Sequence, residues 1–426
     1  MKIAMVSEHA SPLAALGGVD AGGQNVHVAS LSAALAGRGH QVTVYTRRDA
    51  EDLPARVQVS PRLEVVHVPA GPPRHVPKDE LLPFMEDLAA GMARDWQDCP
   101  PDLVHGHFWM SGLAALDAAR RLAAGRARIP VVQTFHALGT VKRRHQGSAD
   151  TSPVERQWLE PAVGRQAGRV LATCSDEAFE LTAMGVAPEK ISIAPCGVDP
   201  HLFSGAGPSE ERGRTHRILS VGRLVPRKGV DVVIGALPYL REAGFDDVEL
   251  LIVGGGGDAA ETGADTEARR LLAVAAELGV REHVRFRGQV PREAMPGIFR
   301  SADVVVCTPW YEPFGIVPLE AMACGIPVVA AAVGGLRDTV VDEGTGLHVP
   351  PRDPEATAQA LARLLADQGL RRALGQAGRQ RARSGYSWDR VAVQTERAYR
   401  QALQDNAASW RRGAGDQLYP VEGAAL

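Results

Sequence analysis

The chain has 426 residues, of which 45% are hydrophobic and 23% are charged, and its formal net charge at pH 7 is -3. Single hydrophobic cores stop growing below this length, so the sequence predicts two domains. The near balance of charges excludes a strong attraction to nucleic acid or to an anionic membrane, and we predict neither as a partner. The sequence contains no run of about 18 apolar residues, so we predict no membrane-spanning helix.

The start of the chain and its cysteines indicate a cytoplasmic protein. Residues 1–7 form a short buried-strand pattern and lack the long apolar region of a signal peptide. The five cysteines show neither disulfide nor metal spacing. We therefore expect small, buried, reduced side chains at Cys99, Cys174, Cys196, Cys307 and Cys324.

The first half of the chain alternates short apolar runs with longer amphipathic segments. The apolar runs predict strands at Lys2–Val6, Gln41–Tyr45, Leu63–Val68, Leu103–Gly106, Pro130–Thr134, Val170–Thr173 and Ile191–Pro195. The amphipathic segments predict helices that include Asn25–Gly37, Leu81–Trp96 and Ser175–Met184. Strands that alternate with helices of this length indicate a parallel, doubly wound sheet.

A polar, glycine-rich stretch over residues 204–215 predicts a linker, after which the pattern starts again. Further strands are predicted at Arg217–Val221, Val248–Val253, His283–Phe286, Val304–Cys307, Pro327–Ala331 and Gly346–Val349. Two closing helices are predicted at Leu361–Arg383 and Trp388–Leu403. The predicted parts are an N-terminal domain (1–203), the linker (204–215), a C-terminal domain (216–385), a closing helix (386–405) and a frayed, flexible tail (406–426).

The predicted fold is therefore α/β, with two facing Rossmann-like domains that each contain a doubly wound parallel sheet. Ligands of such sheets bind at the carboxyl ends of the strands, which places a ligand in the cleft between the domains. Gly22 and Gly23 follow the first strand and open a helix. Their backbone amides could approach a phosphate at the helix N-terminus, although a flexible turn is the alternative.

Two cations follow the first strand of the second domain. Arg223 stands at the end of that strand, and Lys228 stands at the start of the next helix. Two cations that converge on a strand end can neutralise a diphosphate without a metal. A solvated basic turn is the alternative interpretation.

Two carboxylates follow a later strand of the same domain. Glu312 precedes a predicted helix at 317–323, and Glu320 lies within it on the same side. A carboxylate that accepts from neighbouring hydroxyls suits a ribose or a hexose. The backbone amides of Phe314, Gly315 and Ile316 could meet sugar hydroxyls or phosphate at the helix start. The alternative is a helix-capping acid and a surface acid.

A histidine and several absent motifs complete the pattern. His136 closes the apolar strand of residues 131–135, where it could face the cleft or serve as a structural hydrogen-bonding group. His105 and His107 have no nearby acid at metal-ligand spacing. The sequence contains no Asp-x-Asp, no phosphate-binding Gly-x-x-x-x-Gly-Lys-Ser/Thr and no Gly-x-Ser-x-Gly element. We therefore predict no metal site and no resident cofactor.

The paired cations and the Glu-x7-Glu element, in this order, resemble those of the retaining glycosyltransferases of family 4. This family has two facing Rossmann-like domains, the GT-B architecture, and includes sucrose-phosphate synthase. The resemblance implies that Arg223 and Lys228 hold the donor diphosphate, Glu320 the ribose hydroxyls and Glu312 the transferred sugar. It also implies that His136 lies near the primary hydroxyl of that sugar, and that the amide of Gly23 faces the phosphate.

The acceptor side resembles the branches of the family that act on inositol phosphate and on sugar phosphates. In both branches a lysine and an arginine hold the acceptor phosphate, and Lys78 and Arg156 stand at those places. We predict that Asn25 also binds the acceptor. The inositol-phosphate branch has a tyrosine and a threonine where this chain has Phe108 and Ala137, and losing two hydroxyl donors could cost ~1 kcal/mol each.

The predicted function is transfer of a hexose from a nucleoside diphosphate sugar, UDP-linked, with retention of anomeric configuration. The expected catalytic residues are His136, Arg223, Lys228 and Glu312. The partners are the nucleotide sugar and a small sugar or cyclitol acceptor, with or without a phosphate. Two alternatives stay open, a nucleotide-sugar 2-epimerase and a donor-binding protein without catalysis. The oligomeric state also stays open, with a homodimer as one alternative.

Overall fold

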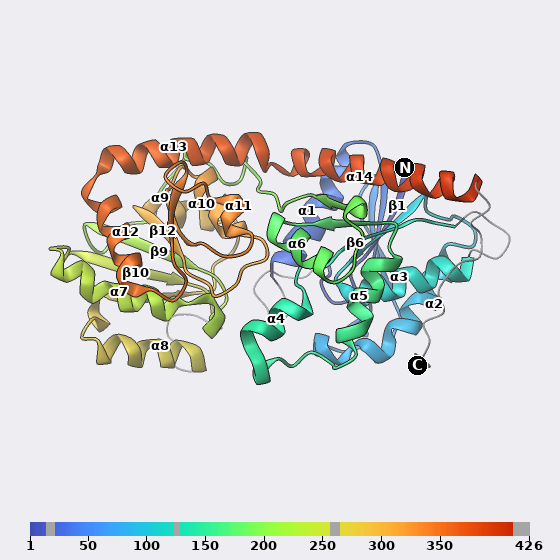
Figure 1. The fold of residues 1–426 in the computed structure, drawn as a ribbon, viewed down its shortest axis with the longest axis horizontal. Helices are drawn as coiled ribbons and strands as arrows, with labels where there is room; N and C mark the ends of the chain where they lie inside the picture. Colours follow the sequence, from blue (N-terminus) through green and yellow to red (C-terminus); the bar gives the residue numbers. More distant parts are fainter. Residues whose placement is uncertain (14–21, 123–127, 256–264, 412–426) are drawn as a thin grey trace.

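The computed structural model describes residues 1–13, 22–122, 128–255 and 265–411. Two α/β lobes lie side by side along the long axis, and the C-terminal helix returns to run over the N-terminal lobe (Figure 1). The two lobes confirm the predicted pair of parallel-sheet domains.

The N-terminal lobe contains one sheet with the strand order β3-β4-β2-β1-β5-β6-β7-β8. Its strands are β1 (Lys2–Val6), β2 (Gln41–Arg47), β3 (Arg56–Ser60), β4 (Leu63–Val68), β5 (Leu103–His107), β6 (Val131–Thr134), β7 (Arg169–Ala172) and β8 (Ile191–Ile193). Its helices are α1 (Gly23–Gly37), α2 (Met85–Asp95), α3 (Trp109–Leu122), α4 (Gly139–Gln146), α5 (Arg156–Gln166) and α6 (Ser175–Ala183). All pairings are parallel except that of β3 with β4.

Strand β3 was not predicted. It lies at the edge of the sheet, and its side chains are partly or fully exposed. An edge strand with a solvated face needs no continuous apolar run, so the hydrophobic signal used for the central strands is absent.

The C-terminal lobe contains a parallel sheet with the strand order β11-β10-β9-β12-β13-β14. Its strands are β9 (His216–Val221), β10 (Val248–Val253), β11 (Val284–Gly288), β12 (Val304–Cys307), β13 (Val328–Ala331) and β14 (Gly346–Val349). The helices of this half of the chain are α7 (Val230–Glu242), α8 (Thr266–Glu277), α9 (Met295–Ser301), α10 (Ile316–Ala323), α11 (Leu336–Thr339), α12 (Pro354–Ala366), α13 (Gln368–Gly385) and α14 (Trp388–Arg411).

Two predictions about the last helices were wrong. The single helix expected over 361–383 is two helices, α12 and α13, because the Asp367 side chain accepts from the amide of Leu370 and starts a new helix. Helix α14 continues to Arg411, so the loose tail expected from Asn406 does not begin there. Residues 412–426, the rest of that predicted tail, lie outside the described residues.

Helix α14 belongs to the core of the N-terminal lobe. Its buried residues Val391 and Tyr399 pack with Ile3 and Met5 of β1. Glu396 of the same helix accepts from the Arg38 guanidinium at 2.7 Å and lies 2.8 Å from His40 Nε2. The chain therefore crosses between the lobes twice, once after β8 and once before α14, and these segments meet where the amide of Val198 donates to the carbonyl of Tyr386.

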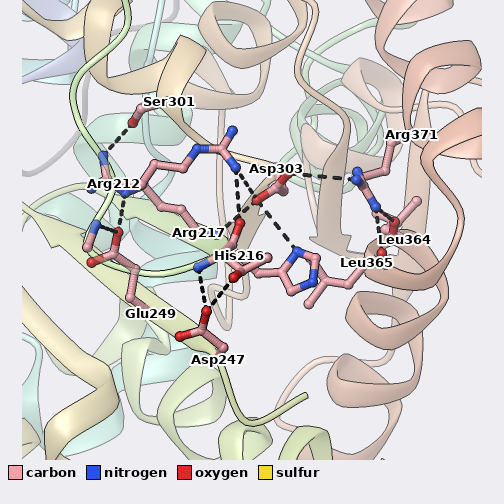
Figure 2. A network of polar contacts seen from close by, with 12 residues as sticks. Arg212, His216, Arg217, Asp247, Glu249, Ser301, Asp303, Leu364, Leu365 and Arg371 are labelled. Atoms are coloured by element: carbon pink, nitrogen blue, oxygen red, sulfur yellow. Dashed lines mark hydrogen bonds and ion pairs between the residues drawn. The ribbon is translucent and has the colours of Figure 1, made fainter. Parts of the chain in front are cut away.

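Residues 204–215, predicted as a linker, are fastened to the C-terminal lobe. Arg212 pairs with Asp303 at 2.9 Å, and the fully buried Arg217 donates to the carbonyl of Glu211 at 2.7 Å. Arg217 also pairs with Glu249 at 2.7 Å and with the Ser301 hydroxyl at 2.6 Å (Figure 2). This network lies at the amino ends of β9 and β10, so it stabilises the lobe at the edge opposite the strand ends that bind ligands.

The predicted burial of the cysteines is confirmed for Cys174, Cys196 and Cys324. Cys307 is half-buried, and Cys99 is exposed near the amino group of Lys2, so the prediction was wrong for Cys99. Within the described ranges, every helix is too short or too polar to span a lipid bilayer.

Candidate active site

A cleft of about 420 Å³ lies between the two lobes. The predicted residues that line it from the N-terminal lobe are Gly22, Gly23, Asn25, Lys78, Phe108, His136 and Ala137. The predicted residues that line it from the C-terminal lobe are Arg223, Lys228, Glu312, Phe314, Gly315, Ile316 and Glu320. The structure therefore brings these residues together around one cavity, and it places Arg156 behind the cavity wall.

Lys228 and Glu312 form a direct ion pair, and they follow the neighbouring central strands β9 and β12 of the C-terminal sheet. Burial lowers the pKa of the Lys228 ammonium, and the Glu312 carboxylate partly offsets this. Burial opposes ionisation of Glu312, but Lys228 and Arg227 outweigh it, so the pKa of Glu312 is lowered. The pair is charged, partly accessible and next to the more exposed Arg223. A diphosphate that entered here would meet Lys228 and Arg223 together.

The turn that carries Glu312 rests on two glycines that the sequence reasoning missed. The amide of Gly335 donates to the carbonyl of Glu312 at 2.8 Å. A Cβ at Gly334 would lie 2.3 Å from that same carbonyl oxygen, and Gly334 has a φ of 47°. Glycine is therefore required here, and the Gly334-Gly335 pair that follows a strand was the available signal.

Glu320 lies on α10 with only 5% of its surface exposed. Burial raises its pKa to about 7, although Arg292 opposes the shift. Arg292 Nη1 lies 2.8 Å from Glu320 Oε1, and Arg292 also lines the cleft. Sequence reasoning missed Arg292, which lies in the loop between β11 and α9 and could have been noticed as a cation close after a strand.

Gly23 lies close to the C-terminal lobe at the start of α1. A Cβ at Gly23 would lie 3.3 Å from the Ile316 side chain and 3.5 Å from that of Phe314. Asn25 fixes the turn before α1, since its side chain accepts from the amide of Gly22 at 2.9 Å and donates to the carbonyl of Ser11 at 2.9 Å. These contacts make Asn25 a structural residue of the turn as well as a cleft residue.

His136 follows β6 in a left-handed conformation with a φ of 64°. Its Nε2 lies 2.9 Å from Nδ1 of His107, and its ring meets the edge of the Phe314 ring at 5.2 Å. Burial and neighbouring histidines hold its pKa well below the ordinary value, so the ring is neutral. Its Nδ1 has no hydrogen-bond partner among the described residues.

Arg156 is used inside the N-terminal lobe. It is 3% exposed, pairs with Glu160 at 2.8 Å and donates to the carbonyl of Ala137 at 2.6 Å. Its guanidinium lies 5.0 Å from the centre of the Phe108 ring. Arg156 thus supports two residues that line the cleft, Phe108 and Ala137, and direct binding of an acceptor by Arg156 stays a prediction.

His9 is a further cleft residue that the sequence reasoning missed. Its Nδ1 lies 2.8 Å from Oε1 of the buried Glu8, and its ring meets the Phe108 ring at 5.0 Å. Glu8 is held in turn by the Ser111 hydroxyl, which accepts from the amide of Glu8 at 3.0 Å. The position just after β1 was the available signal.

Comparisons with known proteins agree with this arrangement. The chain matches the family description "Glycosyltransferase Family 4" over residues 21–202 and "Glycosyl transferases group 1" over residues 207–381. It is 37% identical to a D-inositol 3-phosphate glycosyltransferase of Xylanimonas cellulosilytica, covering 96% of this chain and 98% of that protein. A protein of the same name from Kineococcus radiotolerans is also 37% identical, with 97% and 98% covered.

Solved structures show the same architecture. Sucrose-phosphate synthase from Thermosynechococcus elongatus superposes with a TM-score of 0.83 at 31% identity, covering 95% of this chain and 99% of that one. Anabaena HepE, solved in complex with UDP and glucose, has a TM-score of 0.69 at 19% identity, covering 94% of this chain and 99% of that one, and shows the shared fold. The chain therefore belongs to the glycosyltransferases of family 4 and has the two-lobed GT-B architecture.

Proposed function

We propose that this glycosyltransferase moves a hexosyl group from a nucleoside diphosphate sugar, UDP-linked, to a hydroxyl of a small sugar or cyclitol acceptor. The observation that carries the proposal is the convergence of Arg223, Lys228, Glu312 and Glu320 in one interlobe cleft. The cations suit the diphosphate, and the carboxylates suit the hydroxyls of ribose and of the transferred sugar.

The proposed reaction retains the anomeric configuration, as the resemblance to retaining glycosyltransferases implies. The bond between the anomeric carbon and the diphosphate oxygen breaks, and a bond from that carbon to the acceptor oxygen forms on the same face. The acceptor proton passes to the leaving diphosphate. Lys228 and Arg223 would stabilise the charge that develops on the leaving group, an electrostatic effect that is often the largest in catalysis.

We propose that no metal or resident cofactor takes part, since these two cations can provide the positive charge that a divalent ion provides elsewhere. The Lys228–Glu312 pair supports this role. The negative charge of the diphosphate would take the place of the Glu312 carboxylate as the partner of Lys228. It would thereby keep the Lys228 ammonium protonated despite its burial. Glu312 would then be available to the hydroxyls of the transferred sugar.

The acceptor is proposed from the relatives and from this chain's own cleft wall. The relatives named above are D-inositol 3-phosphate glycosyltransferases, and Lys78 lines the cleft from the N-terminal lobe. Phe108 and Ala137 offer no hydroxyl to a phosphate, and Arg156 is paired with Glu160. We therefore propose a polyhydroxylated ring as the acceptor and expect a phosphate on it to contribute less to binding than in those relatives.

The test is an incubation with a panel of UDP-sugars, with and without sugar and cyclitol acceptors, in the presence and absence of a chelator. A new glycoside that keeps the donor's anomeric configuration, formed only with an acceptor and unaffected by the chelator, is the expected result. Conversion of the donor without an acceptor would identify an epimerase. Nucleotide binding without turnover would identify a binding protein, and loss of turnover with the chelator would overturn the metal-free mechanism.

A further inference from the structure

The turn that carries Glu312 also contacts the N-terminal lobe through a buried threonine. Thr173 follows β7, and its hydroxyl oxygen lies 3.2 Å from the carbonyl oxygen of Pro313. The same hydroxyl lies 2.5 Å from Oε2 of Glu177, which is on α6. The amide of Thr173 donates to that Oε2 at 2.6 Å. Thr173 and Glu177 are 3% and 4% exposed, so water does not replace these partners.

These two contacts compete for one hydrogen. A threonine hydroxyl donates a single hydrogen bond, whereas a carboxylate and a backbone carbonyl can only accept. When Glu177 is ionised, its carboxylate takes the hydrogen of Thr173, and the Pro313 carbonyl faces an oxygen lone pair. When Glu177 is protonated, it donates to the Thr173 oxygen, and Thr173 donates its own hydrogen to Pro313. The state of Glu177 thus decides whether the interlobe hydrogen bond exists.

The surroundings of Glu177 raise its pKa, so that its carboxyl group gains or loses a proton near neutral pH. Burial raises the pKa of Glu177 to about 7, which the hydrogen bonds from Thr173 oppose. The nearby acids Glu160 on α5 and Asp176 on α6 raise it further. The other titratable groups that face Glu177 are Cys174, Cys196 and Tyr311. The pKa lies above the ordinary carboxyl value, so the proton is present below about pH 7 and is lost above it.

We propose that Thr173 and Glu177 are positioning residues that fasten the turn at Pro313 to the N-terminal lobe when Glu177 carries a proton. The turn matters because Glu312 and Phe314 flank Pro313 and both line the cleft. The inference rests on the proposed function only in describing this turn as part of a donor site.

A second contact between the lobes shows why the effect is local. The amide and the hydroxyl of Ser175 both donate to the Asp338 carboxylate at 2.6 Å. These bonds involve neither Glu177 nor Thr173 and keep α6 against α11 in both protonation states. Loss of the Thr173–Pro313 bond therefore loosens the turn without separating the lobes.

Hydrogen exchange in the absence of any ligand tests the positioning. The amides of Gly335 and Leu319 report on the turn because they donate to the carbonyls of Glu312 and Gly315. We compare the protection factors of these amides against exchange in the wild type and in Glu177→Gln. The ratio of wild type to variant should fall about fivefold between about pH 5.5 and about pH 8.5. Glutamine imitates the ionised acid at every pH, since its carbonyl oxygen must accept from the Thr173 amide at the place of Oε2 and therefore also accepts from the Thr173 hydroxyl.

Two substitutions of Thr173 provide the matched controls. Thr173→Val removes the hydroxyl, so its protection should match that of the ionised wild type at both pH values. Thr173→Ser keeps the hydroxyl and should follow the wild type. The proposal is overturned if Glu177→Gln shows the same pH dependence as the wild type, or if Thr173→Val is as protected as Thr173→Ser at about pH 5.5.

Binding of UDP by the same four proteins separates this proposal from the proposed function. We expect Glu177→Gln to bind UDP about fivefold more weakly than the wild type below about pH 6, and equally above about pH 8. Equal affinities of the two proteins at every pH would overturn the effect on the donor site. If none of the proteins bound UDP, the proposed function would fail, while the exchange measurement would still decide whether Thr173 and Glu177 position the turn.

Discussion

The two ends of the cleft use charged pairs in opposite ways. In the C-terminal lobe, Lys228 and Glu312 contact each other, and both line the cleft. In the N-terminal lobe, Arg156 and Glu160 are almost completely buried behind the cleft wall. A ligand can exchange partners with a pair at the cavity surface, whereas separating a fully buried pair leaves an uncompensated charge and costs several kcal/mol, about 3–5.

This difference shows that residue type alone does not define a binding group. An arginine near a strand end suits a phosphate, but an arginine that already pairs with a buried carboxylate is not available to bind one. Arg223 and Lys228 line the cleft, where the proposed function has them bind the donor diphosphate. Arg156 instead packs over the Phe108 ring and donates to the carbonyl of Ala137, so its charge supports the cleft wall in the N-terminal lobe.

The largest expected effect is at the donor end. Lys228→Ala should lower kcat by roughly two to three orders of magnitude, because it removes a cation placed against the developing charge of the leaving group. The free energy of unfolding should fall less than in Arg156→Ala below, since the Lys228–Glu312 pair is partly accessible and Arg227 and Arg223 remain beside Glu312. Turnover and urea unfolding check this, with the exposed Lys2→Ala as the matched control. Near-normal turnover would refute the role of Lys228.

Arg156→Ala should have the opposite profile. Removing this guanidinium leaves Glu160 buried without its cation, so we expect the free energy of unfolding to fall by about 3 kcal/mol. Urea unfolding measures this, and Arg165→Ala on the exposed side of the same helix is the control. A variant with unchanged stability and weaker binding of a phosphorylated acceptor only would show that Arg156 is a ligand group after all.

Sequence reasoning located the central strands because they are continuous apolar runs. The predicted bounds of Lys2–Val6, Leu63–Val68, Val248–Val253 and Val304–Cys307 are those of β1, β4, β10 and β12. A strand buried on both faces needs apolar residues throughout, so its pattern is independent of its partners. The edge strand β3 lacks that requirement, and only the fold shows where it pairs.

Residues of the candidate site could be predicted where they follow strand ends. The ion pairs and hydrogen bonds that these residues make were harder to predict from the sequence. Arg156 and Glu160 stand four positions apart on α5, so their pairing could have been expected from helix geometry. Arg292 and Glu320 come from different elements, and nothing local in the sequence joins them. The contact of Thr173 with Pro313 likewise depends on how two lobes meet, which no local pattern encodes.

The pH dependence of nucleotide binding should sharpen the comparison further. Glu320 has a pKa of about 7, above the ordinary carboxyl value, so it is ionised and a better acceptor for ribose only above that pH. Ionisation of Glu177 is expected to weaken UDP binding over the same pH range. The affinities are therefore measured in the Glu177→Gln protein, in which residue 177 does not titrate. There, Glu320→Gln should weaken UDP binding about tenfold at about pH 8.5 and hardly at all at about pH 6.

Comparing the two proteins at each pH cancels the titration of UDP itself. Calorimetry provides the affinities. A ratio that does not change with pH would show that the ionisation of Glu320 does not control binding of the nucleotide.

The smallest expected effect is at the acceptor end. Phe108→Tyr and Ala137→Thr each add one hydroxyl to the wall that Arg156 supports, at positions where the resemblance to the inositol-phosphate branch implies such donors. Each should strengthen binding of inositol 3-phosphate by about fivefold, the contribution of one hydrogen bond, without changing the affinity for UDP. Phe108→Leu is the control for altered packing. If neither hydroxyl improves binding, the acceptor's phosphate does not reach this wall, and the ring hydroxyls of the acceptor must be recognised elsewhere in the cleft, with His9 as the first residue to test.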